Sequence, residues 1–302
     1  MGKKLQQGLA VEAFNRGLSL IEKGKLERGV FYCDLAVRRA RDHARDPAMC
    51  DLTACALHCK ASALTELGRF DEAIEACNQV LDRFGHAREP ELREHVARAL
   101  VSKGTLLLSA ARRTPGRYEE TLGVFDEVVD RYRDAAEPSL REHVAKAIVN
   151  RLTVVVELET PEATMRQLAP SHARIDQACR KVDLGQPAEA LSYFDDAISR
   201  RGGAIDPVSR TIVAEALYNK AATLNRLGRF DDAVTCFDEV VERFGDATDP
   251  SQRAMVARAL EGKGTALGRL GRSRERIATL DEVLARFSGL AGLQESVAGT
   301  LA

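Results

Sequence analysis

The chain has 302 residues, 45% hydrophobic and 29% charged, so it can bury a core and does not have the composition of a disordered protein. Its 44 basic and 45 acidic residues balance, which disfavours a nucleic-acid partner because such binding depends largely on neutralising phosphates. No apolar run approaches the roughly 18 residues of a membrane span, so we expect no contact with a membrane. The start of the sequence lacks a secretory pattern, and the seven cysteines do not have the spacing of a disulfide framework. We therefore expect a cytoplasmic protein.

Taken in chain order, the predicted elements are helices in pairs. An acid–proline step opens the longer helix of most pairs, because an acidic side chain can cap free amides and proline tolerates the first helical position. This helix, of about 20 residues, ends at a glycine turn, and a second helix of about 14 follows. The acid–proline steps are Asp46-Pro47, Glu89-Pro90, Glu137-Pro138, Asp206-Pro207 and Asp249-Pro250, and the turn glycines are Gly24, Gly68, Gly116, Gly185, Gly228 and Gly271.

Apolar residues recur at helical spacing in both helices of a pair. Leu217 and Leu224 share one face of the first helix, and Phe230, Val234 and Phe237 follow on the second. Neither helix can bury such a stripe alone, so the pattern predicts that neighbouring pairs stack into an array.

The pairs carry a recurring sequence. Residues 67–71 and 227–231 both read Leu-Gly-Arg-Phe-Asp, and most turn glycines lie about 43 residues apart. A small residue recurs in the first helix, at Gly17, Ala61, Gly104, Ala178, Ala221 and Gly264. A bulky or apolar residue recurs in the second helix, at Cys33, Cys77, Phe125, Phe194, Phe237 and Leu280.

At these residues, from about Ala10 to Phe287, the chain resembles the tetratricopeptide repeat family, in a bacterial type with long repeats. The resemblance implies an all-α, right-handed superhelical solenoid of antiparallel helix pairs. The family tryptophan is replaced by leucine or isoleucine, and the period exceeds the family's 34 residues by about nine. HEAT or armadillo repeats fit the period, but they lack the Gly-Arg-Phe turn and are the second choice of fold.

The array is interrupted near its middle. A first helix that starts at Lys146 has no recognisable turn or second helix after it, and Thr160-Pro161 opens what looks like the next first helix. Pro170 should kink that helix. We therefore expect two sub-arrays, residues 1–159 and residues 160–302 with a terminal capping segment. We also expect an irregular join, a candidate hinge, between Leu158 and Pro170.

The resemblance implies that the first helices line a concave groove for a protein or peptide partner, so that the chain acts as an adaptor, scaffold or regulatory subunit. An asparagine in this groove can hold an extended ligand because its amide both donates and accepts hydrogen bonds. The matching asparagines are Asn15, Asn150 and Asn219, and the neighbouring groove candidates are Phe14, His58, Tyr218, Asn225, Arg226, Arg258 and Arg269. The alternative is that these are ordinary exposed helix residues.

A column of basic residues precedes the small residue of each first helix: Arg16, Lys60, Lys103, Arg151, Lys220 and Lys263. By helical phase the column faces away from the groove. We therefore expect it to pair with second-helix acids such as Asp126, Asp238 and Asp281, rather than to form a ladder for acidic partners.

No motif indicates an enzyme, and we assign no catalytic residue, metal ligand or cofactor. The phosphate-loop-like Gly262-Lys-Gly-Thr265 lacks a preceding strand and recurs in register at residues 102–105, which favours helix packing. Cys55, His58 and Cys59 share a helix face, so a metal- or redox-responsive sensor is the alternative from another class. His95 and His143 lie in identical Arg-Glu-His-Val-Ala segments, which argues against catalysis. A peptide-sensing regulator is a third possibility, although no helix-turn-helix precedes Ala10.

Overall fold

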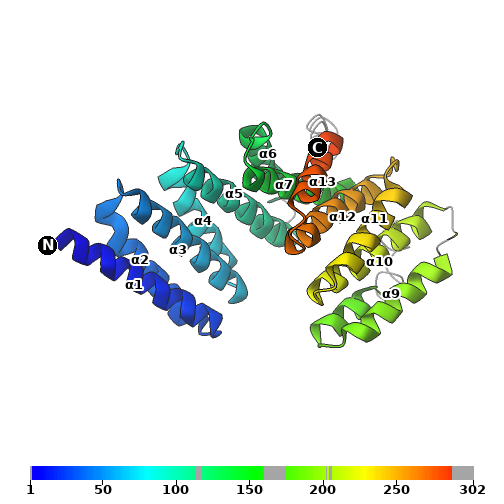
Figure 1. The fold of residues 1–302 in the computed structure, drawn as a ribbon, viewed down its shortest axis with the longest axis horizontal. Helices are drawn as coiled ribbons and strands as arrows, with labels where there is room; N and C mark the ends of the chain where they lie inside the picture. The colour runs from blue at the N-terminus through cyan, green and yellow to red at the C-terminus, as the bar shows by residue number, and fades with distance from the viewer. Residues whose placement is uncertain (1, 113–116, 160–174, 202, 204–205, 288–302) are drawn as a thin grey trace. The chain divides into compact units, whose positions relative to one another are not determined.

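The computed structural model describes residues 2–112, 117–159, 175–201, 203 and 206–287, and these residues form helices without any strand. A short 3₁₀ turn, η1 (Arg41–His43), follows the first pair, and residues 175–183 are helical. Longer first helices alternate with shorter second helices along the chain (Figure 1). The first helices are α1 (Gly2–Glu22), α3 (Pro47–Glu66), α5 (Pro90–Ala111), α7 (Pro138–Glu159), α10 (Pro207–Arg226) and α12 (Pro250–Arg269). The second helices are α2 (Leu26–Ala40), α4 (Phe70–Phe84), α6 (Tyr118–Tyr132), α9 (Pro187–Arg201), α11 (Phe230–Phe244) and α13 (Ser273–Phe287).

The chain divides into two compact units, Met1–His143 and Val144–Ala302, and the division falls inside α7. We call them the N-terminal and C-terminal units and describe each by itself. The predicted irregular join beyond Leu158 falls mainly on residues 160–174, which lie outside the described part of the chain.

Aspartate caps the start of the first helices. Asp46 accepts a hydrogen bond from the backbone N–H of Ala48, and Asp206 and Asp249 accept one from Ser209 and Gln252. These bonds satisfy amides that have no partner within the helix. The cap expected at Glu89 is wrong, because its side chain makes no capping hydrogen bond to α5 and instead accepts one from the Arg88 amide.

Glycine ends the first helices where the sequence predicts a turn. Gly68 and Gly228 have φ of 73° and 74°, a left-handed conformation that costs glycine little and other residues more. Gly24, Gly185 and Gly271 adopt the same conformation, whereas the expected turn at Gly116 lies outside the described residues.

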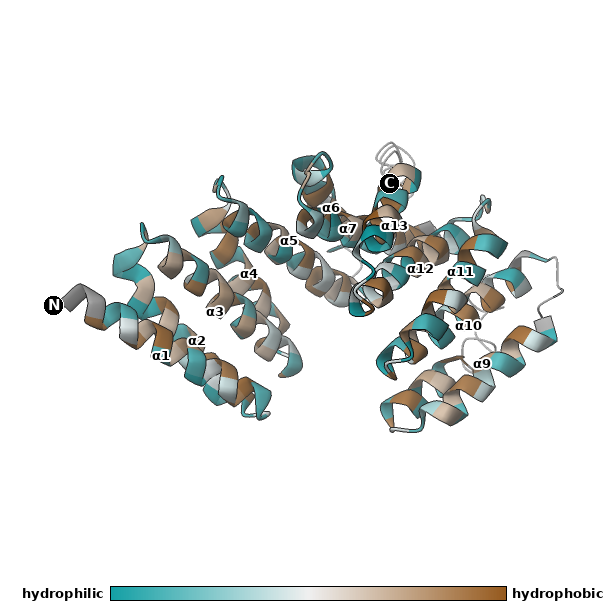
Figure 2. Cartoon of the chain, in the orientation of Figure 1, coloured by the Kyte–Doolittle hydropathy of each residue, from teal (hydrophilic) through white to brown (hydrophobic). Residues whose placement is uncertain are grey.

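Second helices pack against neighbouring first helices. In the N-terminal unit α2 contacts α1 and α3, and α4 contacts α3 and α5. In the C-terminal unit α11 contacts α10 and α12. The core lies between these helices, where Phe125, Phe194 and Phe237 are fully buried. Figure 2 shows apolar segments alternating with hydrophilic ones along the helices. This arrangement confirms the predicted all-α solenoid of helix pairs.

The small residues of the first helices allow close approach, but not equally. A Cβ added to Gly104 would lie 2.4 Å from Cε1 of the buried Phe125, and one added to Gly17 would lie 3.2 Å from the Cys33 sulfur. At Gly264 the nearest atom would be 3.6 Å away. Within the described residues, no helix combines the length and apolar character that crossing a bilayer requires.

Candidate functional site

The first helices of each unit lie beside one another. In the N-terminal unit α1 contacts α3 and α3 contacts α5, and in the C-terminal unit α10 contacts α12. We call each of these sets a first-helix layer. Such a layer offers one side to the second helices and leaves the other side for a ligand, so the orientation of each side chain decides which residues are available.

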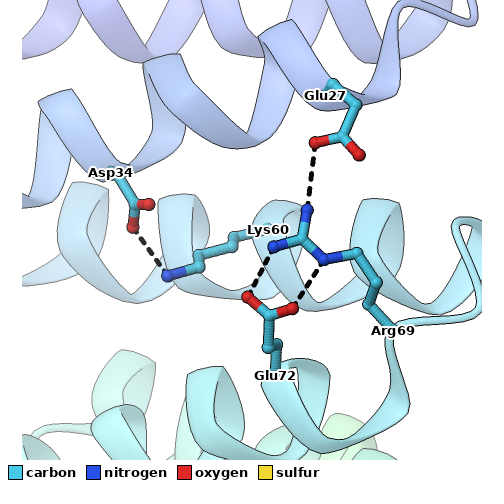
Figure 3. Close-up of polar contacts among 5 residues, drawn as sticks. All are labelled: Glu27, Asp34, Lys60, Arg69 and Glu72. Atoms are coloured by element: carbon cyan, nitrogen blue, oxygen red, sulfur yellow. Dashed lines mark hydrogen bonds and ion pairs between the residues drawn. The ribbon is translucent and has the colours of Figure 1, made fainter.

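Four members of the basic column contact residues of the second helices, as the sequence predicted for the column. The ammonium of Lys60 lies 2.7 Å from Asp34 of the preceding second helix, α2 (Figure 3). Lys220 and Lys263 repeat this contact with Asp195 on α9 and Asp238 on α11, at 2.7 and 2.6 Å. The guanidinium of Arg16 lies 4.7 Å from the centre of the Tyr32 ring. These cations join the two layers of helices and are not a ladder for acidic ligands.

An aromatic and a cation meet between α10 and α12. The guanidinium of Arg258 lies over the ring of Tyr218, 4.3 Å from its centre, which is within cation–π range. The Tyr218 ring also lies near the ring of Phe237, with centroids 6.0 Å apart. Both Tyr218 and Arg258 are half-buried, so core packing holds the pair while part of each side chain remains accessible.

Two predicted asparagines lie on the same helix as Tyr218. Asn219 donates to the backbone carbonyl of Glu215 at 2.9 Å and accepts a long contact from the Cys179 thiol at 3.8 Å. Asn225 donates to the carbonyl of Gly262 at 3.3 Å and so joins α10 to α12. Its side-chain oxygen is buried and has no hydrogen-bond partner among the described residues.

The other predicted residues are spread over both units. In the N-terminal unit Phe14 is half-buried, Asn15 is exposed and His58 stacks on His95, with ring centroids 5.3 Å apart. Asn150, half-buried, lies in the part of α7 that belongs to the C-terminal unit. Arg226, in the last turn of α10, pairs with Asp183 at 3.2 Å, and Arg269 is exposed at the end of α12. The structure thus brings Tyr218 and Arg258 into contact, and it divides the three asparagines between the two units, Asn15 in the N-terminal unit and Asn150 and Asn219 in the C-terminal unit.

Cys55, His58 and Cys59 do not form the ligand cluster that their spacing suggested. Among the described residues, the side chains that converge to within 4.8 Å are instead Asp51, Cys55 and His95. Sequence reasoning missed this group because Asp51 and Cys55 lie on α3 and His95 on α5. His95 follows Asp51 by 44 residues and Cys55 by 40 residues. Both separations are close to the repeat period, which was the only feature of the sequence that could have placed these residues on neighbouring first helices.

The chemistry of this region does not favour redox activity. Burial raises the pKa of the Cys55 thiol, with Asp51 adding to the shift, and burial also raises the pKa of Cys59. Both thiols are therefore protonated near neutral pH, and a protonated thiol is a poor nucleophile. Burial lowers the pKa of His58 to about 3, with contributions from His95 and Arg98, so its imidazole is neutral.

With the helix pairs described, comparison with known proteins decides the family. The family model described as tetratricopeptide repeat matches residues 60–136, 175–248 and 218–291, which together make up more than half of the chain. This chain belongs to the tetratricopeptide repeat family. No curated protein sequence matches this tetratricopeptide repeat protein.

Solved structures similar to this tetratricopeptide repeat protein have low sequence identity to it. BtubC (BKLC) from P. vanneervenii is 17% identical, with 85% of this chain and 89% of that chain covered and a TM-score of 0.36. The TPR2AB domain of yeast Sti1, in complex with pHSP90, is 14% identical, with 97% of both chains covered and a TM-score of 0.35. The human IFIT1 dimer with m7Gppp-AAAA is 15% identical, with 96% of this chain and 71% of that chain covered and a TM-score of 0.21.

Proposed function

We propose that this protein is a non-catalytic interaction module that binds an extended segment of a protein partner on the first-helix layer of its C-terminal unit. Family membership supports an interaction module, because stacked helix pairs leave one layer of first helices available along the array. The observation that carries the choice of surface is the Tyr218–Arg258 pair, an aromatic ring and a guanidinium held together between α10 and α12.

The side chains around this pair suit an extended polypeptide. Tyrosine and arginine combine apolar contact area with polar atoms and are enriched among residues that dominate binding energy. The buried oxygen of Asn225, which lacks a hydrogen-bond partner among the described residues, can accept from a ligand N–H once side chains shift. Asn219 has only a weak contact at its oxygen, the 3.8 Å approach of the Cys179 thiol, and a ligand amide can replace it.

The charges favour a partner segment with acidic side chains. Arg226 and Arg269 are exposed at the ends of α10 and α12, and Arg226 has an exposed pairing partner in Asp183 that a ligand carboxylate can displace at small cost. Phe14, Asn15 and His58 belong to the N-terminal unit, and we propose that they form a second surface that also binds a protein partner. Asn150 lies in the C-terminal unit, so we assign it to the same surface as Tyr218 and Arg258.

Random peptides displayed on phage and selected on the immobilised full-length chain provide the test. We expect selected peptides with acidic residues, whose affinity, measured by fluorescence anisotropy, falls at least about tenfold in the Tyr218→Ala/Arg258→Ala double variant. The matched control is Asp196→Ala/Arg200→Ala, which removes a contact confined to the second helix α9 and should leave affinity unchanged. Equal affinity of wild type and the Tyr218/Arg258 variant for every selected peptide would exclude this surface.

The asparagines are tested separately. The Asn150→Ala/Asn219→Ala variant should weaken the same peptides if the amides hold the ligand backbone. Unchanged affinity in this variant, together with loss in the Tyr218/Arg258 variant, would retain the surface and reject the role of the asparagines.

A further inference from the structure

The side-chain cluster between α3 and α5 has a composition that the proposed interaction function does not use. His95 Nε2 lies 2.9 Å from an oxygen of Asp51 and 3.9 Å from the sulfur of Cys55, and all three ligand atoms lie within 4.8 Å of one another. We propose that Asp51, Cys55 and His95 form a binding site for a divalent transition-metal ion of the zinc class.

The distances are close to those of a zinc site. With bond lengths of 2.0–2.3 Å and tetrahedral angles, zinc holds its oxygen, nitrogen and sulfur ligands about 3.3–3.6 Å from one another. The separations of 2.9 and 3.9 Å lie on either side of this range. The third separation, between Asp51 and Cys55, is at most 4.8 Å, so side-chain rotations that bring the three atoms to zinc distances are short.

The helices hold the ligands in position before an ion binds. Asp51 and Cys55 are four residues apart on α3, which places both side chains on one helix face. His95, on α5, is only 6% exposed, and its ring is stacked on His58. The Nδ1 atom of His95 has no hydrogen-bond partner among the described residues. Without an ion, the contact with the Asp51 carboxylate favours the tautomer that carries its proton on Nε2. Because Nδ1 has no competing partner among the described residues, it can take that proton when Nε2 binds a metal.

An ion can reach the site from solvent. The Asp51 side chain is 54% exposed, and Cys55 is half-buried. Three protein ligands leave a fourth position for water or an exogenous ligand, as in zinc sites that are not closed by four side chains. Binding exchanges the S–H bond of Cys55 for a sulfur–metal bond and releases that proton to the buffer. The Asp51 carboxylate and the Cys55 thiolate together balance the two positive charges of the ion.

The repeat provides an internal comparison for this site. The segment Arg-Glu-His-Val-Ala occurs at residues 93–97 on α5 and again at residues 141–145 on α7. Asp51 and Cys55 occupy the fifth and ninth positions of α3, and Glu94 and Arg98 occupy these positions of α5. An arginine therefore stands where the site has its sulfur ligand, and Arg98 pairs with Glu94 at 3.1 Å. His95 on α5 therefore has two ligand side chains, Asp51 and Cys55, on the preceding first helix. The equivalent positions for His143 hold Glu94 and Arg98, and the arginine is not a metal ligand.

The ligand types select the ion. Sulfur and imidazole nitrogen favour zinc, cobalt or nickel, whereas magnesium and calcium prefer sites made only of oxygen. Zinc and cobalt are therefore the probes, added to the full-length chain after removal of metal with a chelator.

We expect titration calorimetry to show one zinc ion per chain, with proton release visible as a dependence of the heat on buffer. We expect cobalt to give the absorption bands of a thiolate-bound, low-symmetry ion. Cys55→Ser should abolish the thiolate-to-cobalt band, and Asp51→Asn and His95→Gln should weaken zinc binding at least about tenfold. His143→Gln and Cys59→Ser should bind as wild type does.

Circular dichroism in the presence of chelator establishes that each variant is folded. The wild-type cobalt spectrum tests the site even where a variant does not fold. Absence of bound zinc and cobalt in wild type would overturn the proposal. Equal loss of zinc binding in His143→Gln and His95→Gln would overturn it as well, and so would a thiolate band that persists in Cys55→Ser.

Discussion

Arg69, which directly follows a turn glycine, joins two consecutive helix pairs: its guanidinium lies 3.0 Å from Glu27 on α2 and also binds Glu72 on its own second helix, α4 (Figure 3). Arg117 and Arg272 repeat the arrangement, lying 3.7 and 3.5 Å from Asp71 and Asp231 of the preceding second helices. Each arginine therefore links the start of one second helix to the start of the previous one.

This turn contact leads to a first prediction. Arg69→Ala should lower the thermal unfolding midpoint of the chain slightly, because it removes contacts that hold neighbouring pairs but are exposed to solvent. The loss should shrink as salt is raised from 0.05 to about 1 M, since salt screens exposed charges. Melting curves by circular dichroism at both salt concentrations measure it. The control is Arg229→Ala, at the equivalent arginine before α11. The residue equivalent to Glu27 on the preceding second helix, α9, is Ala188. This control therefore removes the contact with Asp232 on the arginine's own second helix but no contact equivalent to Arg69–Glu27. A larger or salt-independent loss in Arg229→Ala would contradict the assignment.

The repeat made most of the fold predictable from sequence. Asp46, Pro47 and Gly68 mark the ends of α3 by local backbone chemistry, which does not depend on the rest of the chain. Helical spacing also identified the buried faces, for example at Phe237. The cap at Glu89 could not be distinguished from one at Asp249 by the acid–proline pattern, and the structure shows that only the shorter aspartate makes the bond.

The candidate sites were less predictable because they depend on contacts between helices. Spacing of three and four places Cys55, His58 and Cys59 on one face, but it does not show that His95 lies opposite Cys55. Likewise the groove asparagines were chosen by position, and their actual partners are set by neighbouring helices. Asn225, for example, donates to Gly262 on α12.

A second prediction compares two helix glycines. Gly104→Ala should destabilise the chain by about 1–3 kcal/mol, because the added methyl would overlap the buried ring of Phe125. Gly264→Ala should be neutral or stabilise by up to about 1 kcal/mol, since its methyl has room and alanine favours the helix. Urea unfolding of the two variants and wild type measures both. A Gly104→Ala variant as stable as Gly264→Ala would show that the Phe125 ring can move aside.

A third prediction concerns the helix caps. Asp249→Ala should lower the free energy of unfolding by about 1 kcal/mol, because the backbone amide of Gln252 loses its acceptor. Glu89→Ala removes an acid from the same position of α5 but no capping bond, so its effect should be much smaller. Both variants retain the following proline. Equal losses in the two variants, measured by urea unfolding, would mean that charge near the helix start, rather than the hydrogen bond, provides the stabilisation.

The last prediction is a loss of stability in alkali that depends on Cys77. Burial raises the pKa of this thiol from its ordinary value near 9 to about 12, with Lys103 opposing the shift. Below pH 9 the thiol is protonated in both states, and pH has no effect through this group. Above pH 9 the unfolded chain loses the proton while the folded chain keeps it, so the free energy of unfolding falls as pH rises, by up to about 1.4 kcal/mol per pH unit until the folded thiol also ionises. Cys77→Ala should therefore lose less stability than wild type between pH 9 and pH 11 in urea unfolding experiments. Parallel pH profiles for the two proteins would mean that the Cys77 thiol ionises in the folded chain as easily as in the unfolded one.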